Sequence, residues 1–521
     1  MALVLASVVS AVSLTAQQPR LVVGIVVDGL TGETLEKLRP FMDRNGFNRF
    51  FNHGAVLDNI DFGTNVNAAT ASAILATGAA PKVNGIGGGM LYDPITHRRE
   101  YIFADREENG INTKEPFSPR ALRVSTLSDE SRIAGAGTTS VHSIAPDATQ
   151  ALIWGGHAGN SAVWLDTYTG TWASTSFYPE FPIPANNANK NYPLSARIDT
   201  MQWVPSEVTV SASGLPARLT DSSFKYTFGG NSADKYDKFA NSPFVNSEIT
   251  RLALDYLATL ELGRHEGFDI LNLTYNLQPY EWSQNVDNRY ELYDSYIKLD
   301  NDLAQLFTTI DNTIGRDNTL IYIAGTPPRD SRRRDDGRYN IPGGEFSSRK
   351  AVSLLNLYLI ALYGNGEWVT AFNNGNFYLN AILANERNIE VSTLRRQTAD
   401  FLVRMAGIGH AYTIDDIVRG DIIVPNASGQ ARNTIISQSG DVFINLIPGW
   451  TLVDDYNFID HIPQNAYSVA PTTAMFMITA PDIEPKRIDT PVDARAIAPT
   501  LAGMLHIRSP NGADTPSVSL K

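Results

Sequence analysis

The chain has 521 residues, of which 43% are hydrophobic and 19% are charged. This length and composition exclude a disordered chain, a coiled coil and a minimal module, and they predict a large folded core. The 42 basic and 55 acidic residues give a formal charge of −13, which argues against a nucleic-acid partner. The chain has no cysteine, which excludes disulfides, thiolate metal sites and a cysteine nucleophile.

The N-terminus, MALVLASVVSAVSLTAQQPR, is an apolar stretch of small residues that ends in a polar stop. This pattern is typical of an export signal, here residues 1–16 with cleavage near Ala16, although a first buried helix is the alternative. Beyond it, no apolar run approaches the roughly eighteen residues that cross a bilayer, so we expect no transmembrane segment in the mature chain. The predicted location is therefore the periplasm or the cell envelope.

Strands and helices are predicted to alternate along the rest of the chain. The β-branched run LVVGIVVDGL is typical of a buried strand, and it ends at the carboxylate of Asp28, where open α/β sheets place their active sites. This spacing predicts an α/β fold, with a mostly parallel sheet sandwiched between helices. The further expected elements are helices over 33–53, 247–262 and 287–314, strands at 55–62, FDILNLTY and TLIYIAG, and a turn opening into a helix in NVNAATASAILATG.

Two stretches differ in amino-acid composition from the rest of the chain, and they are interpreted as insertions into a single domain over 17–521. The first, about 158–245, is rich in aromatic, Asn, Pro, Ser and Thr residues and is expected to be a cap. The second, about 331–435, opens with the charged surface loop RDSRRRDDGRYN, for which a basic ligand patch is the alternative. It is predicted to hold a strand over 352–362 and a helix over 391–405.

Two further features have a structural and a functional interpretation. The aromatic residues in and around the first insertion favour packing over a groove for sugar or peptide. The glycine-rich GIGGGM over 85–90 precedes a Tyr-Asp turn and lacks the lysine of a phosphate-binding loop, so it is interpreted as a turn. The aromatic residues are Trp154, Trp164, Trp172, Tyr178 and Tyr192.

Eight segments along the chain carry a family resemblance: VVDGL, GFNRFFNHGAVLDN, ILATGAAPKVNGIGGGMLYD, SPRALRVSTLSDE, WLDTYTGTWASTSFY, YIKLDNDLAQLF, SGDVFINLIPGW and ARAIAPTLAGMLHI. In this order, they resemble the alkaline phosphatase superfamily. The similarity is to type I phosphodiesterase/nucleotide pyrophosphatase-like proteins, and most of all to bacterial exported phosphate-irrepressible alkaline phosphatases. It implies an alkaline-phosphatase-like fold with inserted cap regions, and an ancestry of phosphate-ester hydrolysis with two zinc ions.

The resemblance assigns the first metal ligand to Asp28, which is present. The family's nucleophilic Thr or Ser precedes the glycine of the ATG turn by about ten residues, and that count reaches Ala68. A methyl group cannot attack phosphorus. Thr70 and Ser72 stand nearby as less favoured substitutes.

The other positions that the resemblance assigns to metal ligands hold residues unsuited to zinc. Pro279 and Ser283 replace an Asp-x-x-x-His pair, and Thr326 and Pro327 replace an Asp-His pair. Pro463 replaces the last histidine. His461, two residues away, could reach the site, although a surface imidazole is favoured.

The positions that the resemblance assigns to phosphate binding also hold residues unsuited to that role. Gly89 takes the place of an asparagine, and Asp147 and Thr149 take the places of a Lys-x-Arg pair. A carboxylate at such a position repels an ester phosphate.

The leading hypothesis is a non-catalytic pseudophosphatase that acts as a partner-binding or assembly subunit of the cell envelope, with no cofactor expected. The alternative is an active, zinc-dependent phosphomonoesterase or phosphodiesterase with a rearranged site, using Asp28 with displaced ligands such as His461 and Asp330. A weaker alternative is a glycan- or nucleotide-binding module. The partner and the oligomeric state are not predicted.

Overall fold

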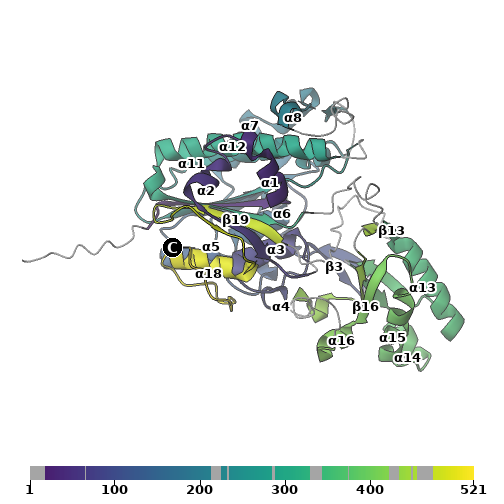
Figure 1. Cartoon of the computed structure of the whole chain (residues 1–521). Coiled ribbons are helices and arrows are strands. Elements are labelled where there is room, and N and C mark those ends of the chain that lie inside the picture. Colours follow the sequence, from purple (N-terminus) through teal and green to yellow (C-terminus); the bar gives the residue numbers. More distant parts are fainter. Residues whose placement is uncertain are drawn as a thin grey trace, which may run out of the picture.

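A mixed sheet with a mostly parallel pattern of strand pairing forms the centre of the computed structural model (Figure 1). Its middle strands run parallel, whereas the strands near the two edges include antiparallel ones. The structure describes residues 18–64, 66–94, 96–212, 224–230, 234–283, 288–328, 343–373, 375–421, 433–447, 450–453 and 473–520. The strand order is β20 (Lys486–Ile488), β2 (Ala55–Asp61), β19 (Thr473–Thr479), β12 (Thr319–Thr326), β1 (Leu21–Asp28), β11 (Asp269–Asn276), β6 (Val141–Ala145), β7 (Ser161–Asp166), β8 (Thr171–Thr175) and β5 (Gly110–Ile111), with β21 (Val492–Asp493) beside β2.

Helices cover both faces of this sheet, as the sequence predicted (Figure 1). The apolar side chains of β1 alternate between the two layers: Val23 and Val27 pack into one core, and Val22 and Val26 into the other. The first layer contains α1 (Gly32–Leu38), α2 (Asn48–His53), α7 (Ile183–Asn191), α10 (Lys235–Ala240), α11 (Phe244–Thr259) and α12 (Arg289–Thr313). The second contains α3 (Ala68–Thr77), α5 (Leu127–Ala134), α6 (Ala148–Gly155) and α18 (Ile497–Met504), and the short α4 (Pro81–Asn84) follows α3.

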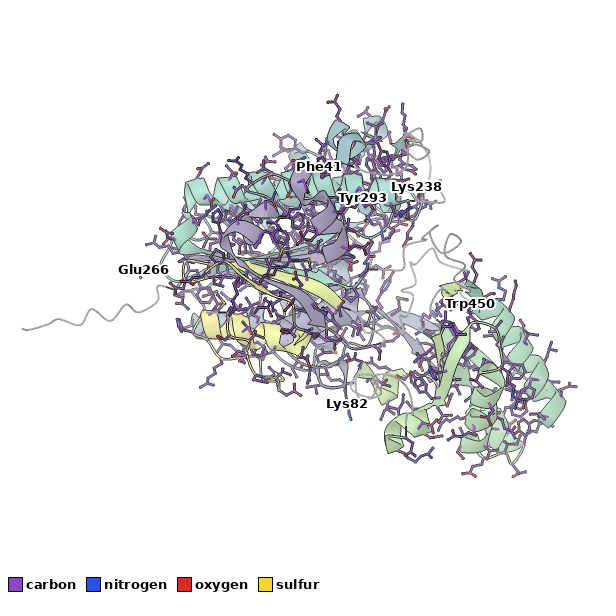
Figure 2. The ribbon with its side chains drawn as sticks, viewed as in Figure 1. Phe41, Lys82, Lys238, Glu266, Tyr293 and Trp450 are labelled. Atoms are coloured by element: carbon purple, nitrogen blue, oxygen red, sulfur yellow. The ribbon has the colours of Figure 1, made fainter. Side chains whose placement is uncertain are left out.

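A hydrogen bond between side chains joins two helices of the first layer. Lys37 of α1 donates to the hydroxyl of Tyr293 on α12 at 2.8 Å, and Figure 2 shows Tyr293 within this layer.

The region beyond α7 contains the short sheet of β9 (Gln202–Trp203) and β10 (Tyr226–Thr227), and α8 (Glu207–Ala212). Within the segment expected to be a cap, β7 and β8 belong to the main sheet.

A separate lobe lies to one side of the main sheet and has its own apolar core (Figure 1). Trp450 belongs to this lobe (Figure 2), and its ring packs against Gly407, where an added Cβ would lie 2.3 Å from the indole. The lobe contains the sheet β14 (Val369–Asn373), β15 (Asn376–Leu379), β17 (Val442–Leu446) and β16 (Ile408–Thr413), the pair β13 (Gly344–Ser347) and β18 (Trp450–Val453), and the helices α13 (Ser348–Tyr363), α14 (Ala381–Glu386), α15 (Val391–Leu402) and α16 (Ile414–Arg419).

The hairpin of β3 (Met90–Asp93) and β4 (Arg98–Tyr101) joins this lobe to the main body. Arg99 donates to the backbone oxygen of Phe372 at 2.7 Å. The ring of Tyr92 meets that of Tyr378 edge-on, with 4.7 Å between centroids. The hairpin therefore holds the lobe through a few specific contacts.

The predicted strand over 352–362 is wrong, because this segment lies in α13. Its buried side chains, Ala351, Val352, Leu355 and Leu359, recur at helical spacing. An apolar run can form either element, and here its length favours a helix. The single helix expected over 33–53 is also interrupted, since α1 ends at Leu38 and a 3-10 turn containing Pro40 follows.

Four of the five aromatic residues singled out in the sequence are buried, which supports packing over a groove at those positions. Tyr192, in contrast, is 61% exposed. No helix among the described residues is long and apolar enough to cross a membrane. The proposed signal, residues 1–16, and the charged loop over 331–342 lie outside the described residues.

We predict that Asp294→Ala destabilises the fold by about 3 kcal/mol in urea unfolding, because it leaves buried donors without an acceptor. Asp294 on α12 is fully buried and accepts from Trp203 Nε1 at 2.7 Å, Ser206 N at 2.7 Å and Thr209 Oγ1 at 2.8 Å. The exposed Asp317→Ala is the control and should change stability by less than about 0.5 kcal/mol. Equal effects of the two substitutions would contradict this role.

We also predict that acid destabilises the fold partly through His142. Burial lowers the pKa of His142 to about 4, with a smaller contribution from Arg132, while its Nδ1 lies 2.8 Å from Ser161 Oγ. The unfolded chain binds this proton from about pH 6.5 downward, so stability falls between about pH 6.5 and 4, by about 3 kcal/mol from this group. His142→Gln should flatten this part of the stability curve, as measured by urea unfolding across the same pH range.

Candidate functional site

The candidate site lies at the C-terminal edge of three adjacent parallel strands. Asp28 ends β1, Thr326 ends β12 and Asn276 ends β11, and the pairing register puts Asp28 directly beside both neighbours. The fully buried Thr326 donates its hydroxyl to Asp28 Oδ1. The sheet thus brings together two of the predicted positions, Asp28 and Thr326, through a direct hydrogen bond.

Neutral groups complete this edge of the sheet. The backbone N–H of Gln278 donates to Asn276 Oδ1 at 2.8 Å, and its side-chain Nε2 donates to the backbone oxygen of Pro327 at 3.3 Å. Gln278 also packs on Gly29, where φ is +85° and an added Cβ would lie 2.9 Å from the amide carbon. Through its backbone N–H and its side-chain amide, Gln278 therefore links the ends of β11 and β12 across β1.

A buried phenol supports the turn that follows Asp28. Tyr296 of α12 donates to the backbone oxygen of Gly29 at 3.3 Å and accepts from Thr31 N at 2.8 Å. Burial raises the pKa of Tyr296 to about 12, so the phenol stays protonated and neutral at physiological pH.

The position assigned to the nucleophile is the first residue of α3. Ala68 is half-buried there and follows the N-cap residue Asn67, whose side-chain oxygen accepts from Thr70 N at 2.9 Å. The Thr70 hydroxyl also donates to Asn67 Oδ1, at 3.1 Å, and Ser72 donates to Gln150 Oε1 at 2.6 Å. Both hydroxyls are buried in structural hydrogen bonds, which argues against either as a nucleophile.

Two of the positions assigned to phosphate binding lie close to each other. An added Cβ at Gly89 would lie 4.0 Å from Thr149 Oγ1. Asp147 is the N-cap of α6, just before Thr149, and accepts from Gln150 N at 3.0 Å. The start of α6 therefore already carries a carboxylate, which disfavours an anion at that end.

Ser283, at a predicted ligand position, takes part in a different network. It donates to the buried Glu291 Oε1 of α12 at 2.8 Å and accepts from the Tyr226 hydroxyl at 3.3 Å. Pro279 is half-buried and offers no side-chain donor atom. His461, Pro463 and Asp330 lie outside the described residues.

The described residues do not fit a pair of zinc ions. Zinc is bound by imidazole, carboxylate and thiolate groups, whereas the strand ends here present one carboxylate with a hydroxyl, two amides and proline. Across the described ranges, no group of three or more His, Asp or Glu side chains could hold a metal ion.

Sequence reasoning missed Asn276, Gln278 and Tyr296. The polar Asn276 at the end of the buried run DILNLTYN was the available signal, since the strand beside it ends in Asp28. Gln278 and Tyr296 carried no such signal, because neither belongs to a recognisable motif.

Comparison with known proteins agrees with this architecture. Residues 22–326 match the family model for type I phosphodiesterase / nucleotide pyrophosphatase, more than half of the chain. The chain therefore belongs to this family, within the alkaline phosphatase superfamily, which confirms the resemblance found in the sequence.

Individual relatives extend the similarity over nearly the whole chain. Alkaline phosphatase PhoV of Synechococcus elongatus is 27% identical, over 96% of this chain and 92% of its own. Alkaline phosphatase PafA of Elizabethkingia meningoseptica is 25% identical, over 95% and 93%. The crystal structure of alkaline phosphatase PafA matches with a TM-score of 0.83 at 22% identity, covering 96% of this chain and 98% of that one, which confirms the predicted fold.

We predict that Thr326→Val lowers the free energy of unfolding by about 1–2 kcal/mol, because it removes the hydroxyl donor to Asp28 while keeping the shape of the side chain. Thr309→Val is the matched control, since its exposed hydroxyl only donates within α12, to the backbone oxygen of Gln305. Urea unfolding of the two variants measures the difference. If both variants matched the parent, the Thr326 hydroxyl would have no role in stability.

Proposed function

We propose that this chain is a non-catalytic member of its family, a pseudophosphatase that acts as a binding or assembly subunit of the cell envelope. The observation that carries the proposal is the hydrogen bond from Thr326 to Asp28. It engages the retained carboxylate through a protein hydroxyl, at a strand end where the resemblance expects an acidic metal ligand.

The first turn of α3 supports the same proposal. Ala68 offers no nucleophilic atom, and the nearby hydroxyls of Thr70 and Ser72 are bonded within the helix layer. Gly89, Thr149 and Asp147 provide neither the amide nor the cations that would hold an ester phosphate.

A role in binding is supported by the outward surface of α13. Leu354 is 50% exposed, Leu357 64% and Leu362 48%, and exposed apolar side chains that gather on one helix are typical of interaction surfaces. The apolar N-terminus supports export to the envelope.

The second candidate function is a metal-dependent phosphatase with a rearranged site. It is favoured by two observations: the relatives PhoV and PafA are both named alkaline phosphatases, and Asp28 is retained at the strand edge. In this candidate, Asp28 would act with residues outside the described ranges, such as Asp330 and His461.

We expect the purified full-length chain to hydrolyse p-nitrophenyl phosphate and bis(p-nitrophenyl) phosphate no faster than its Asp28→Asn variant, before and after incubation with Zn²⁺. A working enzyme of this class accelerates hydrolysis by at least about a millionfold, so the assay separates the two candidates clearly. A chelator should shift the melting temperature by less than about 1 °C, because a large α/β core does not depend on metal to fold.

Asp317→Asn serves as the control for the change in charge. Zinc-stimulated turnover that persists in Asp317→Asn and disappears in Asp28→Asn would overturn the non-catalytic proposal and establish the second candidate. Turnover of equal size in all three proteins would identify a contaminating phosphatase.

A further inference from the structure

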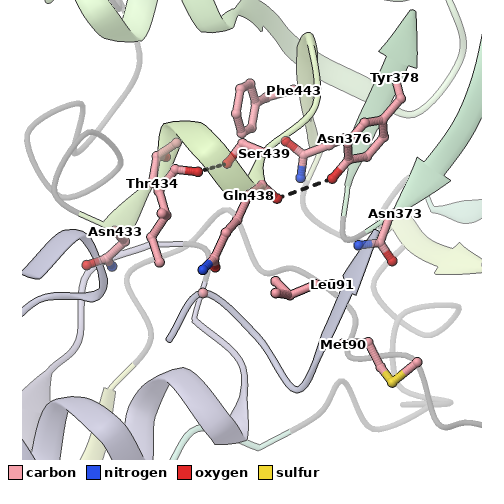
Figure 3. Close-up of a pocket in the computed structure, with 12 residues that line it drawn as sticks. Met90, Leu91, Asn373, Asn376, Tyr378, Asn433, Thr434, Gln438, Ser439 and Phe443 are labelled. Atoms are coloured by element: carbon pink, nitrogen blue, oxygen red, sulfur yellow. Dashed lines mark hydrogen bonds between the residues drawn. The ribbon is translucent and has the colours of Figure 1, made fainter. Parts of the chain in front are cut away.

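Helix α13 lies along the outer side of the separate lobe, away from the main body (Figure 1). The lobe is attached to the main body at a different place, which Figure 3 shows. There the Tyr378 hydroxyl donates to the backbone oxygen of Gln438 at 3.3 Å, and Gln438 Nε2 donates to the backbone oxygen of Gly85 at 3.1 Å. One face of α13 is buried in the lobe core, so its opposite face points outward.

The outward face of α13 is apolar. Leu354, Leu357 and Ala361 are all exposed on it, Leu357 by 64%. Their spacing of three and four residues puts them in one stripe along the helix. From Ala351 to Tyr363 the helix has no charged residue. A helix that is apolar all round is typical of one that is covered on both sides, and the described part of the chain covers only the inner side of α13.

The charges of α13 lie at one end of the helix. Arg349 and Lys350 are exposed in its first turn, which has no acidic residue, and the last turn has no basic residue. A helix carries a partial positive charge at its N-terminus and a partial negative charge at its C-terminus. Lys350 is therefore at the unfavourable end of its own helix, and it would be favourable beside the C-terminus of a helix that runs in the opposite direction.

We propose that the outward face of α13 binds the same face of a second copy of this chain, with the two helices antiparallel about a twofold axis. An axis near Leu357 puts Leu354 of each copy opposite the small Ala361 of the other, so a large side chain faces a small one. It also puts Lys350 beside the last turn of the second helix, whose final carbonyl groups lack partners within the helix. A parallel pair would instead bring the cations of both first turns together, which is repulsive.

A second copy suits this face better than a lipid surface. The helix has 16 residues and is about 24 Å long, too short to cross a hydrocarbon core of about 30 Å. Helices that lie on a membrane bind anionic lipids through cations along a polar face, whereas α13 has cations in its first turn only. The chain's charge of −13 also opposes an anionic surface.

This inference extends the binding role proposed above, but it does not rest on the loss of catalysis. The strand-end residues Asp28, Asn276 and Thr326 belong to the main sheet, whereas α13 belongs to the lobe. Self-association and phosphate-ester hydrolysis are therefore measured independently, and either result leaves the other question open to its own assay.

The first test is sedimentation velocity on the full-length chain, at concentrations between about 1 and 500 µM. Two helices of this length make a small interface, so we expect a reversible monomer–dimer equilibrium with a Kd of about 1–100 µM. Leu357→Glu puts a charge at the centre of the stripe and should raise this Kd at least about tenfold. Lys350→Glu should raise it by about threefold to tenfold, because a carboxylate then faces the negative end of the second helix.

Val418→Glu is the matched control, since Val418 is 62% exposed on α16 of the same lobe and the substitution adds the same charge. It should dimerise like the parent. Circular dichroism and melting temperature first establish that each variant is folded, which is expected because the substituted side chains are exposed. The proposal is overturned if the parent stays monomeric across the concentration range, or if folded Leu357→Glu associates as tightly as the parent.

The orientation of the two helices can be tested directly because the chain has no cysteine. A disulfide needs two Cα atoms within about 7 Å of each other. In the antiparallel pair the two copies of position 357 lie near the axis, whereas those of position 350 lie about 20 Å apart. Oxidation with diamide above the Kd should therefore crosslink Leu357→Cys into a dimer and leave Lys350→Cys uncrosslinked. Equal crosslinking of both variants would overturn the antiparallel arrangement.

Flotation with vesicles of phosphatidylcholine and phosphatidylglycerol tests the lipid alternative. The parent and Leu357→Glu should both remain with the unbound protein. If the parent floats, Leu357→Glu does not, and the parent is monomeric in solution, the face binds lipid and the proposal of a second copy is overturned.

Discussion

The parallel pairing of β12, β1 and β11 is the constraint on which the rest of the site depends. Because the three strands pair in register, their last residues, Thr326, Asp28 and Asn276, must lie in one row. Thr326 is fully buried in this row, whereas Asp28 and Asn276 are half-buried, so the Thr326 hydroxyl in particular needs a partner. The Thr326 hydroxyl donates to Asp28, and Gln278 donates to Asn276 and to the backbone oxygen of Pro327 at the end of β12.

The packing of the sheet does not depend on the residues at these strand ends. The apolar residues that hold β1 in place point above and below the sheet, and they belong to two large cores. The strand-end residues contribute little to either core. Substitutions at these ends can therefore change the chemistry of the site while the layers of helices remain packed.

Much of the fold could be predicted from the sequence because its signals were long and periodic. The strands β1 and β12 are almost continuous apolar runs, and β11 is buried along most of its length although it contains several polar residues. Helices at the expected spacing separate these strands along the chain. The prediction of a strand over 352–362 was wrong because this segment is apolar on most sides. Neither a strand period of two nor a helical period of 3.6 residues therefore stood out in its sequence. The prediction of one long helix over 33–53 missed the break at Pro40.

The candidate site was predictable only in part. Asp28 could be located because it ends a clear strand, and Ala68 because it precedes a recognisable turn. The roles of Gln278 and Tyr296 could not, because they arise from contacts between residues 49 and 267 positions apart in the chain. A single sequence specifies strand ends better than it specifies which distant side chains will meet there.

The attachment of the lobe through the β3–β4 hairpin has a thermodynamic consequence. Among the described residues, the apolar cluster at this junction consists of Tyr92, Ala371 and Tyr378, whereas each side has an extensive core of its own. Asn433 and Gln438 add hydrogen bonds to backbone oxygens of the main body. So small a junction couples the two cores weakly. The lobe and the main body are therefore expected to unfold as separate cooperative units, with two heat-absorption transitions in calorimetry.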